Sequence, residues 1–131
     1  MNHTMDITFV IARKGMPHLY GGEKSTIATA TRLRAHGYTV SFLVPARDAL
    51  NDVLAAEEIE YRPVETADPF AGMRSASWAG RAAKIGNLLR ANFVVWRGAR
   101  RRKTAVVHTS AIPGFFCSWL GAKLAGAKVV Y

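Results

Sequence analysis

Short apolar, β-branched runs alternate along the chain with longer segments in which apolar residues recur at helical spacing. The short runs predict five strands, at residues 7–12, 39–44, 59–62, 105–108 and 128–131. The longer segments predict four helices, at residues 23–36, 48–56, 77–96 and 115–124. Asp48 is placed to cap the second helix, and Gly37 suits the position just after the first. Residues 92–96 also fit extended chain, so the end of the third helix is open.

Alternating strands and helices indicate an α/β fold with helices on both faces of a parallel sheet. Right-handed crossovers favour strand order 3-2-1-4-5, a Rossmann-like open sheet within one domain over residues 1–131. The winding direction reverses between the first and fourth strands, and ligands bind at such a switch point. We therefore expect the loops at residues 13–22 and 109–114 to share a crevice.

The first of these loops ends in Gly21-Gly22, immediately before a helix. Helix N-terminal amides attract phosphate, and glycines allow a ligand to approach the backbone closely. Positive or titratable side chains accompany the glycines, namely Arg13, Lys14, His18 and Lys24. Gly21, Gly22 and His18 are therefore candidate substrate-binding residues, the alternative being a flexible turn that only introduces a helix.

The second loop follows His108, with Thr109 and Ser110 next in the chain. A histidine at this position can act as a base or donate a hydrogen bond to a substrate hydroxyl. His108 is therefore a candidate catalytic residue, with Thr109 and Ser110 as candidate substrate contacts. The alternative is a strand-end histidine whose ring is satisfied by backbone groups.

The sequence lacks the motifs of several common classes of binding site. The first loop has neither the Gly-x-Gly-x-x-Gly dinucleotide fingerprint nor the register of a P-loop, because Glu23 separates Gly22 from Lys24-Ser25. The single cysteine, Cys117, lies in an apolar helix and is expected to be a small core residue. No second ligand stands at metal spacing, so we expect no metal site.

An apolar stripe runs along the third predicted helix. Its members step by three or four residues: Trp78, Ala82, Ile85, Leu89, Phe93 and Trp96. A helix that covers a sheet needs one apolar face, so we expect this stripe to pack on the sheet. Basic flanking residues keep open the alternative of an amphipathic helix on an anionic membrane: Arg81, Lys84, Arg90 and Arg97.

Charge is unevenly distributed. The chain has 18 basic and 9 acidic residues, and every acidic residue lies at or before Asp68. The densest basic run holds Arg97, Arg100, Arg101, Arg102 and Lys103, which we expect to contact an anionic surface. The alternative is a solvated helix end beside an acidic partner. No nucleic-acid motif accompanies the run and no aromatics interleave it, so nucleic acid is not an expected partner.

Length and composition indicate one folded domain. The chain has 131 residues, of which 50% are hydrophobic and 21% are charged. No run of about 18 apolar residues occurs, and no basic leader precedes a long apolar run. We expect a cytoplasmic protein, and its basic residues keep open a peripheral position at the inner face of the membrane.

Several segments together resemble a known family. They are Tyr20-Gly21-Gly22, the block at residues 30–40, the strand end at residues 106–110 and the block at residues 120–131. In this order and spacing they are similar to the N-terminal, acceptor-side domain of GT-B-fold glycosyltransferases of family 4, or group 1.

The resemblance implies transfer of a sugar from a nucleotide-sugar donor to a glycan or lipid-linked acceptor, as in cell-envelope synthesis. It places Gly21 and Gly22 near the donor phosphate and implies no cofactor beyond the nucleotide-sugar co-substrate. The family's C-terminal donor-binding domain has no counterpart here, so we expect inactivity alone and a second domain supplied in cis or in trans. The alternative is a non-catalytic Rossmann-like subunit that docks a catalytic partner at a membrane.

Overall fold

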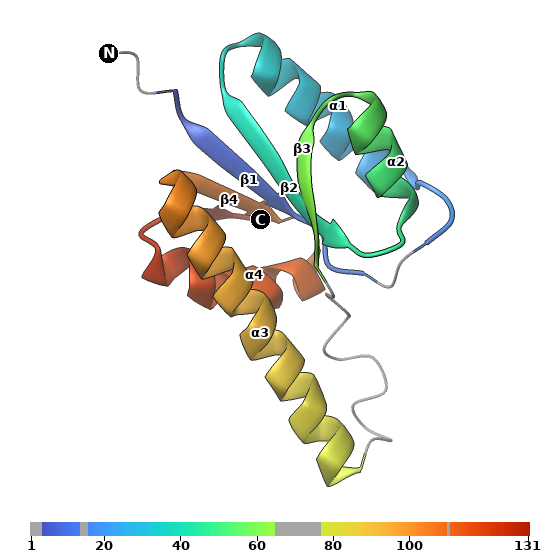
Figure 1. Ribbon diagram of the computed structural model, residues 1–131, viewed down its shortest axis with the longest axis vertical. Helices are drawn as coiled ribbons and strands as arrows, with labels where there is room; N and C mark the ends of the chain where they lie inside the picture. Colours follow the sequence, from blue (N-terminus) through green and yellow to red (C-terminus); the bar gives the residue numbers. More distant parts are fainter. Residues whose placement is uncertain (1–3, 14–15, 65–76, 110) are drawn as a thin grey trace.

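A computed structural model of the chain describes residues 4–13, 16–64, 77–109 and 111–131. Strands and helices alternate within these residues (Figure 1). In chain order they are β1 (Asp6–Val10), α1 (Gly21–Ala35), β2 (Thr39–Pro45), α2 (Ala49–Ala56), β3 (Glu60–Val64), α3 (Trp78–Arg102), β4 (Val106–Thr109), α4 (Ile112–Leu124) and β5 (Lys128–Val130).

All strand pairs are parallel, and the sheet order is β3-β2-β1-β4-β5. The predicted α/β fold class and strand order are therefore confirmed. β1 is central and buried along its whole length. Its last residue, Val10, is level with Leu43 of β2 and Thr109 of β4, which fixes the carboxyl edge of the sheet.

Local signals explain most element boundaries. The Leu50 N–H donates to Asp48 Oδ1 at 2.9 Å, as expected of the cap of α2, and Gly37 adopts a φ of 87° after α1. The predicted turn over residues 109–114 is too long, because α4 already begins at Ile112. Pro113 lies in its first turn, where a missing backbone N–H costs nothing.

The two faces of the sheet have different cores. The face under α1 and α2 carries the larger core, which includes stacked Phe9 and Phe42 with ring centroids 4.9 Å apart. The other face packs against α3 and α4 through smaller residues such as Val10, Val95 and Ala122. Cys117 is buried there beside Ala91, so its expected role as a small core residue is confirmed. In Figure 1, the first half of α3 projects away from the sheet.

The predicted packing of the apolar stripe on the sheet is wrong. α3 is helical without interruption through residues 92–96, but Trp78 is 84% exposed and Leu89 is 56% exposed. The buried positions of α3 are Ala91, Asn92, Val95 and Ala99. Small side chains there let α3 approach α4 and the sheet closely, while the bulky stripe faces outward. Periodicity identified one face of the helix but could not say which face is buried.

Gly121 fixes the crossing of α3 and α4. The Gly121 N–H donates to Asn92 Oδ1 at 3.0 Å, and Asn92 Nδ2 donates to the Phe116 carbonyl at 2.9 Å. A Cβ atom on Gly121 would lie 2.1 Å from the Asn92 carbonyl oxygen and 2.9 Å from the Trp96 nitrogen. Both neighbours are helix backbone, so no side-chain rotation relieves the overlap.

We therefore expect Gly121→Ala to lower the free energy of unfolding by about 3 kcal/mol, because α3 and α4 must separate. Gly86→Ala is the matched control, since a Cβ atom there meets nothing within 4 Å. The control is expected to stabilise the protein by up to about 1 kcal/mol through helix propensity. Urea unfolding measures both values, and equal stability of the two variants would contradict the close crossing.

Candidate functional site

The carboxyl ends of β1 and β4 lie side by side, and each strand leads into a helix, α1 after β1 and α4 after β4. The first turn of α4 touches the end of β1. A Cβ atom on Gly114 would lie 3.2 Å from the Val10 carbonyl oxygen and 3.6 Å from Thr109 Cβ. A side chain at Gly114 would therefore push α4 away from the strand pair. The switch point predicted from the strand order is present at this edge.

The helices that follow β1 and β4 differ from α2 and α3 in how they begin. Asp48 caps α2, and the Gly80 N–H of α3 donates to Ser77 Oγ at 3.1 Å. The N-cap residues of α1 and α4 are Tyr20 and Ala111, neither of which is one of the short polar residues that usually accept from first-turn amides. In α1 the Glu23 side chain reaches back to the Tyr20 N–H, as in a capping box. First-turn amides that have no side-chain acceptor bind an anion or water instead.

Gly21 and Gly22 form the first turn of α1, and both are exposed. A Cβ atom on either glycine would meet nothing within 4 Å, and neither has a positive φ. Neither packing nor backbone conformation therefore requires glycine at these positions. The first intrahelical hydrogen bond runs from the Lys24 N–H to the Tyr20 carbonyl at 3.2 Å, so the glycine amides precede the hydrogen-bonded ladder.

Arg13 joins the loop after β1 to two helices. Its guanidinium pairs with Asp48 at 2.7 Å and with Glu23 at 3.0 Å. Glu23 also accepts the Tyr20 N–H at 3.0 Å, and Asp48 accepts the Met16 N–H at 3.2 Å. The expectation that Arg13 adds a free positive charge to the loop is corrected: two carboxylates compensate it, and it holds the loop in place.

Asp48 is buried, and burial by itself favours the neutral acid. The hydrogen bonds from Arg13, Leu50 and Met16 outweigh this effect and hold the pKa of Asp48 below its ordinary value. The same hydrogen bond from Arg13 to Asp48 raises the pKa of the Arg13 guanidinium, against the effect of burial. Both groups are therefore charged at neutral pH, and sequence inspection had identified Asp48 only as a helix cap.

His108 lies in β4, level with Phe9 of β1 and Val130 of β5. Its ring is tilted against the Phe9 ring at a centroid distance of 5.0 Å. Nδ1 is buried and has no hydrogen-bond partner within the described residues. Desolvation lowers the pKa of His108, so the imidazole is neutral at pH 7 and can accept a proton.

The other candidate residues occupy different environments. Thr109 is fully buried beneath α4, and its hydroxyl has no partner among the described residues. His18 is exposed in the loop after β1, and Lys24 is exposed on α1. Lys14 and Ser110 lie outside the described residues.

The residues of the basic run lie in different environments at the end of α3. Arg102 pairs with Asp6 at 2.9 Å and with Glu60. Arg100 lies over the Trp96 ring, 5.7 Å from its centroid. Arg97 and Arg101 line a hollow between α3 and the sheet, and Lys103 is the exposed C-cap. The alternative of an acidic partner holds for Arg102, whose partners Asp6 and Glu60 come from the first half of the chain. The expected contact of the run with an anionic surface stays a prediction.

Sequence inspection missed an apolar hollow beside the start of α4. It has a volume of about 280 Å³ and is lined by Ile112, Phe115, Phe116 and Tyr131. Tyr131 directly follows β5, so the hollow lies near the carboxyl edge of the sheet. The signal was the cluster of aromatics just after Pro113, which we had assigned only to an apolar helix.

Within the described ranges, no three histidine, cysteine, aspartate or glutamate residues gather as a metal site would require. None of the helices in those ranges is both long enough and apolar enough to cross a membrane.

The lowered pKa of His108 predicts a pH dependence of stability. The unfolded histidine takes up a proton as the pH falls below 6.5, its ordinary pKa, whereas the folded one resists protonation. Acid therefore favours the unfolded chain, and the contribution of His108 is lost as the pH falls from 6.5 through the folded pKa. His108→Gln should flatten the unfolding free energy over this range. Unchanged pH dependence in urea unfolding would contradict the assigned environment.

Comparison with known proteins places the fold. No family model and no curated protein gives a significant match. A solved glycosyltransferase from Rickettsia africae aligns with a TM-score of 0.70 and 21% identity, over 97% of this chain and 29% of that chain. MurG from Acinetobacter baumannii aligns with a TM-score of 0.70 and 22% identity, over 95% of this chain and 34% of that chain.

This chain thus spans about a third of the length of each neighbour. The alignments support the expected likeness to a GT-B glycosyltransferase domain at the level of the fold. Assignment to family 4 is not tested by them. The chain has the Rossmann-like fold of a domain within these glycosyltransferases.

Proposed function

We propose that this chain is the acceptor-side half of a glycosyltransferase that takes its sugar from a nucleotide-sugar. The observation that carries the proposal is the pair of helix N-termini, of α1 with its exposed glycines and of α4, that follow the adjacent strands β1 and β4 at one edge of the sheet. Their amides are suited to the phosphate groups of a nucleotide-sugar. The same fold occurs within two glycosyltransferases, which makes sugar transfer the favoured use of this edge.

The residues present fit distinct parts of such a reaction. Gly21 and Gly22 leave open space above the α1 amides, where a diphosphate can approach the backbone. The neutral His108 can hydrogen-bond a substrate or accept a proton, provided that its ring becomes accessible from the edge. His18, which is exposed in the loop after β1, is proposed as a substrate contact. Ser110 is proposed as a second contact from its place in the sequence alone. Thr109 is buried, so its contribution would be to position the strand end.

The likeness to family 4 supports a cytoplasmic, cell-envelope role with a glycan or lipid-linked acceptor. The apolar hollow beside Ile112 and Tyr131 supports an acceptor that carries an apolar group. The donor-binding half would come from further sequence in the same chain or from a second chain. Residues 1–131 alone are then expected to transfer no sugar from any nucleotide-sugar, and turnover by the isolated chain would refute this division.

Gly22→Val tests the phosphate-binding role of the α1 turn in the enzyme assembled with its donor-binding half. The valine side chain fills the space above the amides, so we expect kcat/KM for sugar transfer to fall by at least about tenfold. The free energy of unfolding should change by less than about 0.5 kcal/mol, because the position is exposed. Gly86→Val, at an equally open glycine of α3, is the matched control and should retain activity. Unchanged kcat/KM in Gly22→Val would contradict the proposal.

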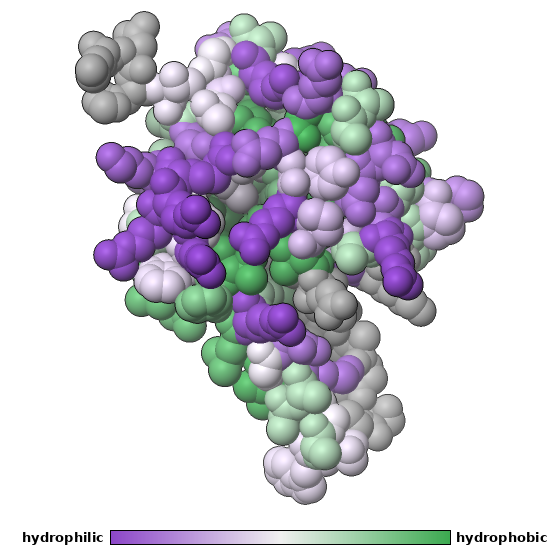
Figure 2. Space-filling view, viewed as in Figure 1, coloured by the Kyte–Doolittle hydropathy of each residue, from purple (hydrophilic) through white to green (hydrophobic). Residues whose placement is uncertain are grey.

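A second proposal concerns the outward stripe of α3, which we infer contacts an anionic membrane. Phe93 and Trp96 share a hollow of about 150 Å³ with Leu120 and Leu124, so the stripe continues onto α4. Figure 2 shows hydrophobic side chains along this flank below a group of hydrophilic ones. Arg81 lies 5.3 Å from the centroid of the Trp78 ring. Aromatic and aliphatic side chains beside arginines favour the interface of an anionic bilayer.

The double substitution Trp78→Ser and Leu89→Ser tests this surface. We expect partitioning into phosphatidylglycerol vesicles to weaken by about tenfold, because two exposed apolar side chains are removed from the interface. Met5→Ser, at an exposed apolar residue that is not part of the stripe, is the control and should bind as the wild type does. Equal binding of the wild type to purely zwitterionic vesicles, or no loss in the double variant, would favour a protein partner instead.

A further inference from the structure

A groove separates the second half of α3 from the strands β2 and β3. Its volume is about 390 Å³. The buried residues Thr8 and Ser41 lie at its floor with Leu43, and Val94 and Gly98 of α3 form a wall. α4 contacts β1, β4 and β5, so the β2–β3 side of this face is left open.

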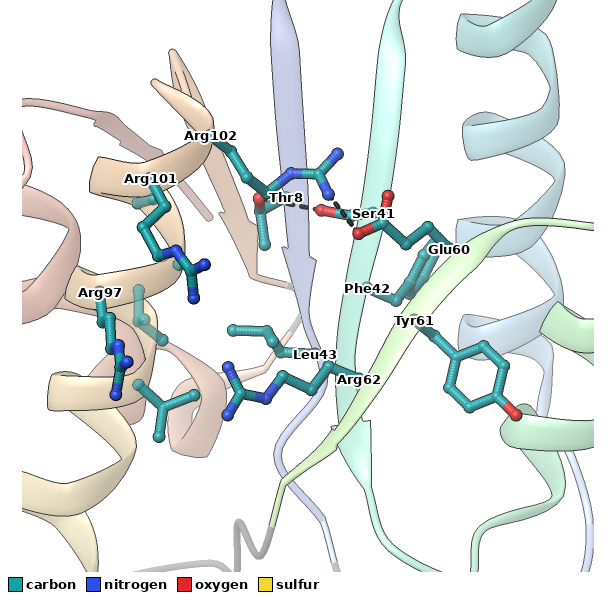
Figure 3. A pocket seen from close by; sticks show the side chains of 14 residues that line it. Thr8, Ser41, Phe42, Leu43, Glu60, Tyr61, Arg62, Arg97, Arg101 and Arg102 are labelled. Atoms are coloured by element: carbon teal, nitrogen blue, oxygen red, sulfur yellow. Dashed lines mark hydrogen bonds and ion pairs between the residues drawn. The ribbon is translucent and has the colours of Figure 1, made fainter.

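Arginines from two elements converge on the groove. Arg97 and Arg101 are one helical turn apart on α3, and Arg62 of β3 extends toward them from the opposite side (Figure 3). An adjoining hollow of about 250 Å³ shares Arg62 and Val94 with the groove and adds Arg90. Arg90, Val94, Arg97 and Arg101 follow helical spacing, so they form one face of α3, separate from the outward stripe.

The positive charge of this groove is not balanced. Among the residues that the structure describes, Glu60 is the one acidic residue that lines it, and Arg102 already pairs with Glu60. Arg62, Arg97 and Arg101 have no ion pair among the described residues. All three side chains are exposed, so their mutual repulsion is that of charges in water and is strongest at low ionic strength. An anion in the groove would remove that repulsion.

We propose that this arginine groove binds a phosphate-bearing ligand, with Arg62, Arg97 and Arg101 as its phosphate contacts. Guanidinium groups hold phosphate through paired N–H donors, and their approach from two walls suits more than one phosphate group. The volume lies within the range of small-molecule sites, and Leu43 and Val94 offer apolar contact beside the charge. The groove lies on the α3 face of the sheet, over the middle of β2 and the first residues of β3. It is therefore a second site, separate from the one proposed at the carboxyl edge.

Calorimetric titration with pyrophosphate tests the groove directly. The wild-type chain should bind pyrophosphate saturably, and Arg62→Gln combined with Arg101→Gln should weaken binding by about tenfold or more. Arg100→Gln removes one positive charge from α3 outside the groove, so it is the matched control for the Arg101 substitution and should stay within about twofold of the wild type. Gly22→Val fills the proposed phosphate site of α1, so in that background pyrophosphate should still bind the groove, and the two arginine substitutions should still weaken this binding by about tenfold or more.

A lipid headgroup and a free phosphate compound present the same chemistry, and vesicles distinguish them. Binding to phosphatidic acid vesicles that pyrophosphate displaces, and that the double variant loses, would assign the groove to a headgroup. Pyrophosphate binding without such displacement would assign it to a soluble ligand. No saturable binding of either probe, or an equal loss in Arg100→Gln, would overturn the proposal.

The thermal stability of the double variant gives an independent check of the charge argument. Because the double variant removes mutual repulsion, its melting temperature at low salt should be equal to or above that of the wild type. A lower melting temperature would show that these arginines stabilise the fold, and it would contradict the charge argument.

Discussion

The parallel pairing of β1 with β4 is the constraint on which the other features depend. Because Val10 and Thr109 are level, the chain leaves both strands at one edge and enters α1 and α4 there. Gly114 allows α4 to start against the end of β1, because a Cβ atom at this position would lie only 3.2 Å from the Val10 carbonyl oxygen. The first-turn amides of these two helices are then backbone donors at the position where a doubly wound sheet binds its ligand.

The loop beside these donors is held by charge. Arg13 connects Asp48 and Glu23, so the end of β1, the cap of α2 and the first turn of α1 share one ion-pair network. This arrangement keeps the Arg13 charge away from incoming phosphate and leaves recognition to backbone amides. A guanidinium that is paired with carboxylates holds its own loop in position, whereas a guanidinium without an acidic partner attracts an anion. The arginine groove is the opposite case, since Arg62, Arg97 and Arg101 have no acidic partner among the described residues.

Three faces of α3 lie in three different environments. Its small residues Ala91, Asn92, Val95 and Ala99 face α4 and the sheet. The stripe from Trp78 to Trp96 faces outward, and Arg97 and Arg101 face the groove. Gly121 and Asn92 set the distance between α3 and α4, and that distance depends on the small residues of the buried face.

The strand order, the cap at Asp48 and the turn at Gly37 were predictable from sequence, because each follows from local spacing or local backbone chemistry. The direction of the α3 stripe was not, because hydrophobic periodicity identifies a face without its partner, and alanines beside an asparagine proved to be the buried side. Gly21, Gly22 and His108 were named as candidates from the sequence, whereas the Arg13 pairs were not, because the pair with Asp48 joins residues 35 positions apart. Arg62 also escaped notice, since only the fold brings β3 opposite α3.

The most direct test of the shared edge is amide chemical-shift mapping during titration with uridine diphosphate. Recognition by the two helix N-termini predicts that the largest shifts occur at Gly21, Gly22 and Gly114, in the first turns of α1 and α4. Shifts confined to one of these turns, or found only elsewhere on the sheet, would contradict a common phosphate site between β1 and β4.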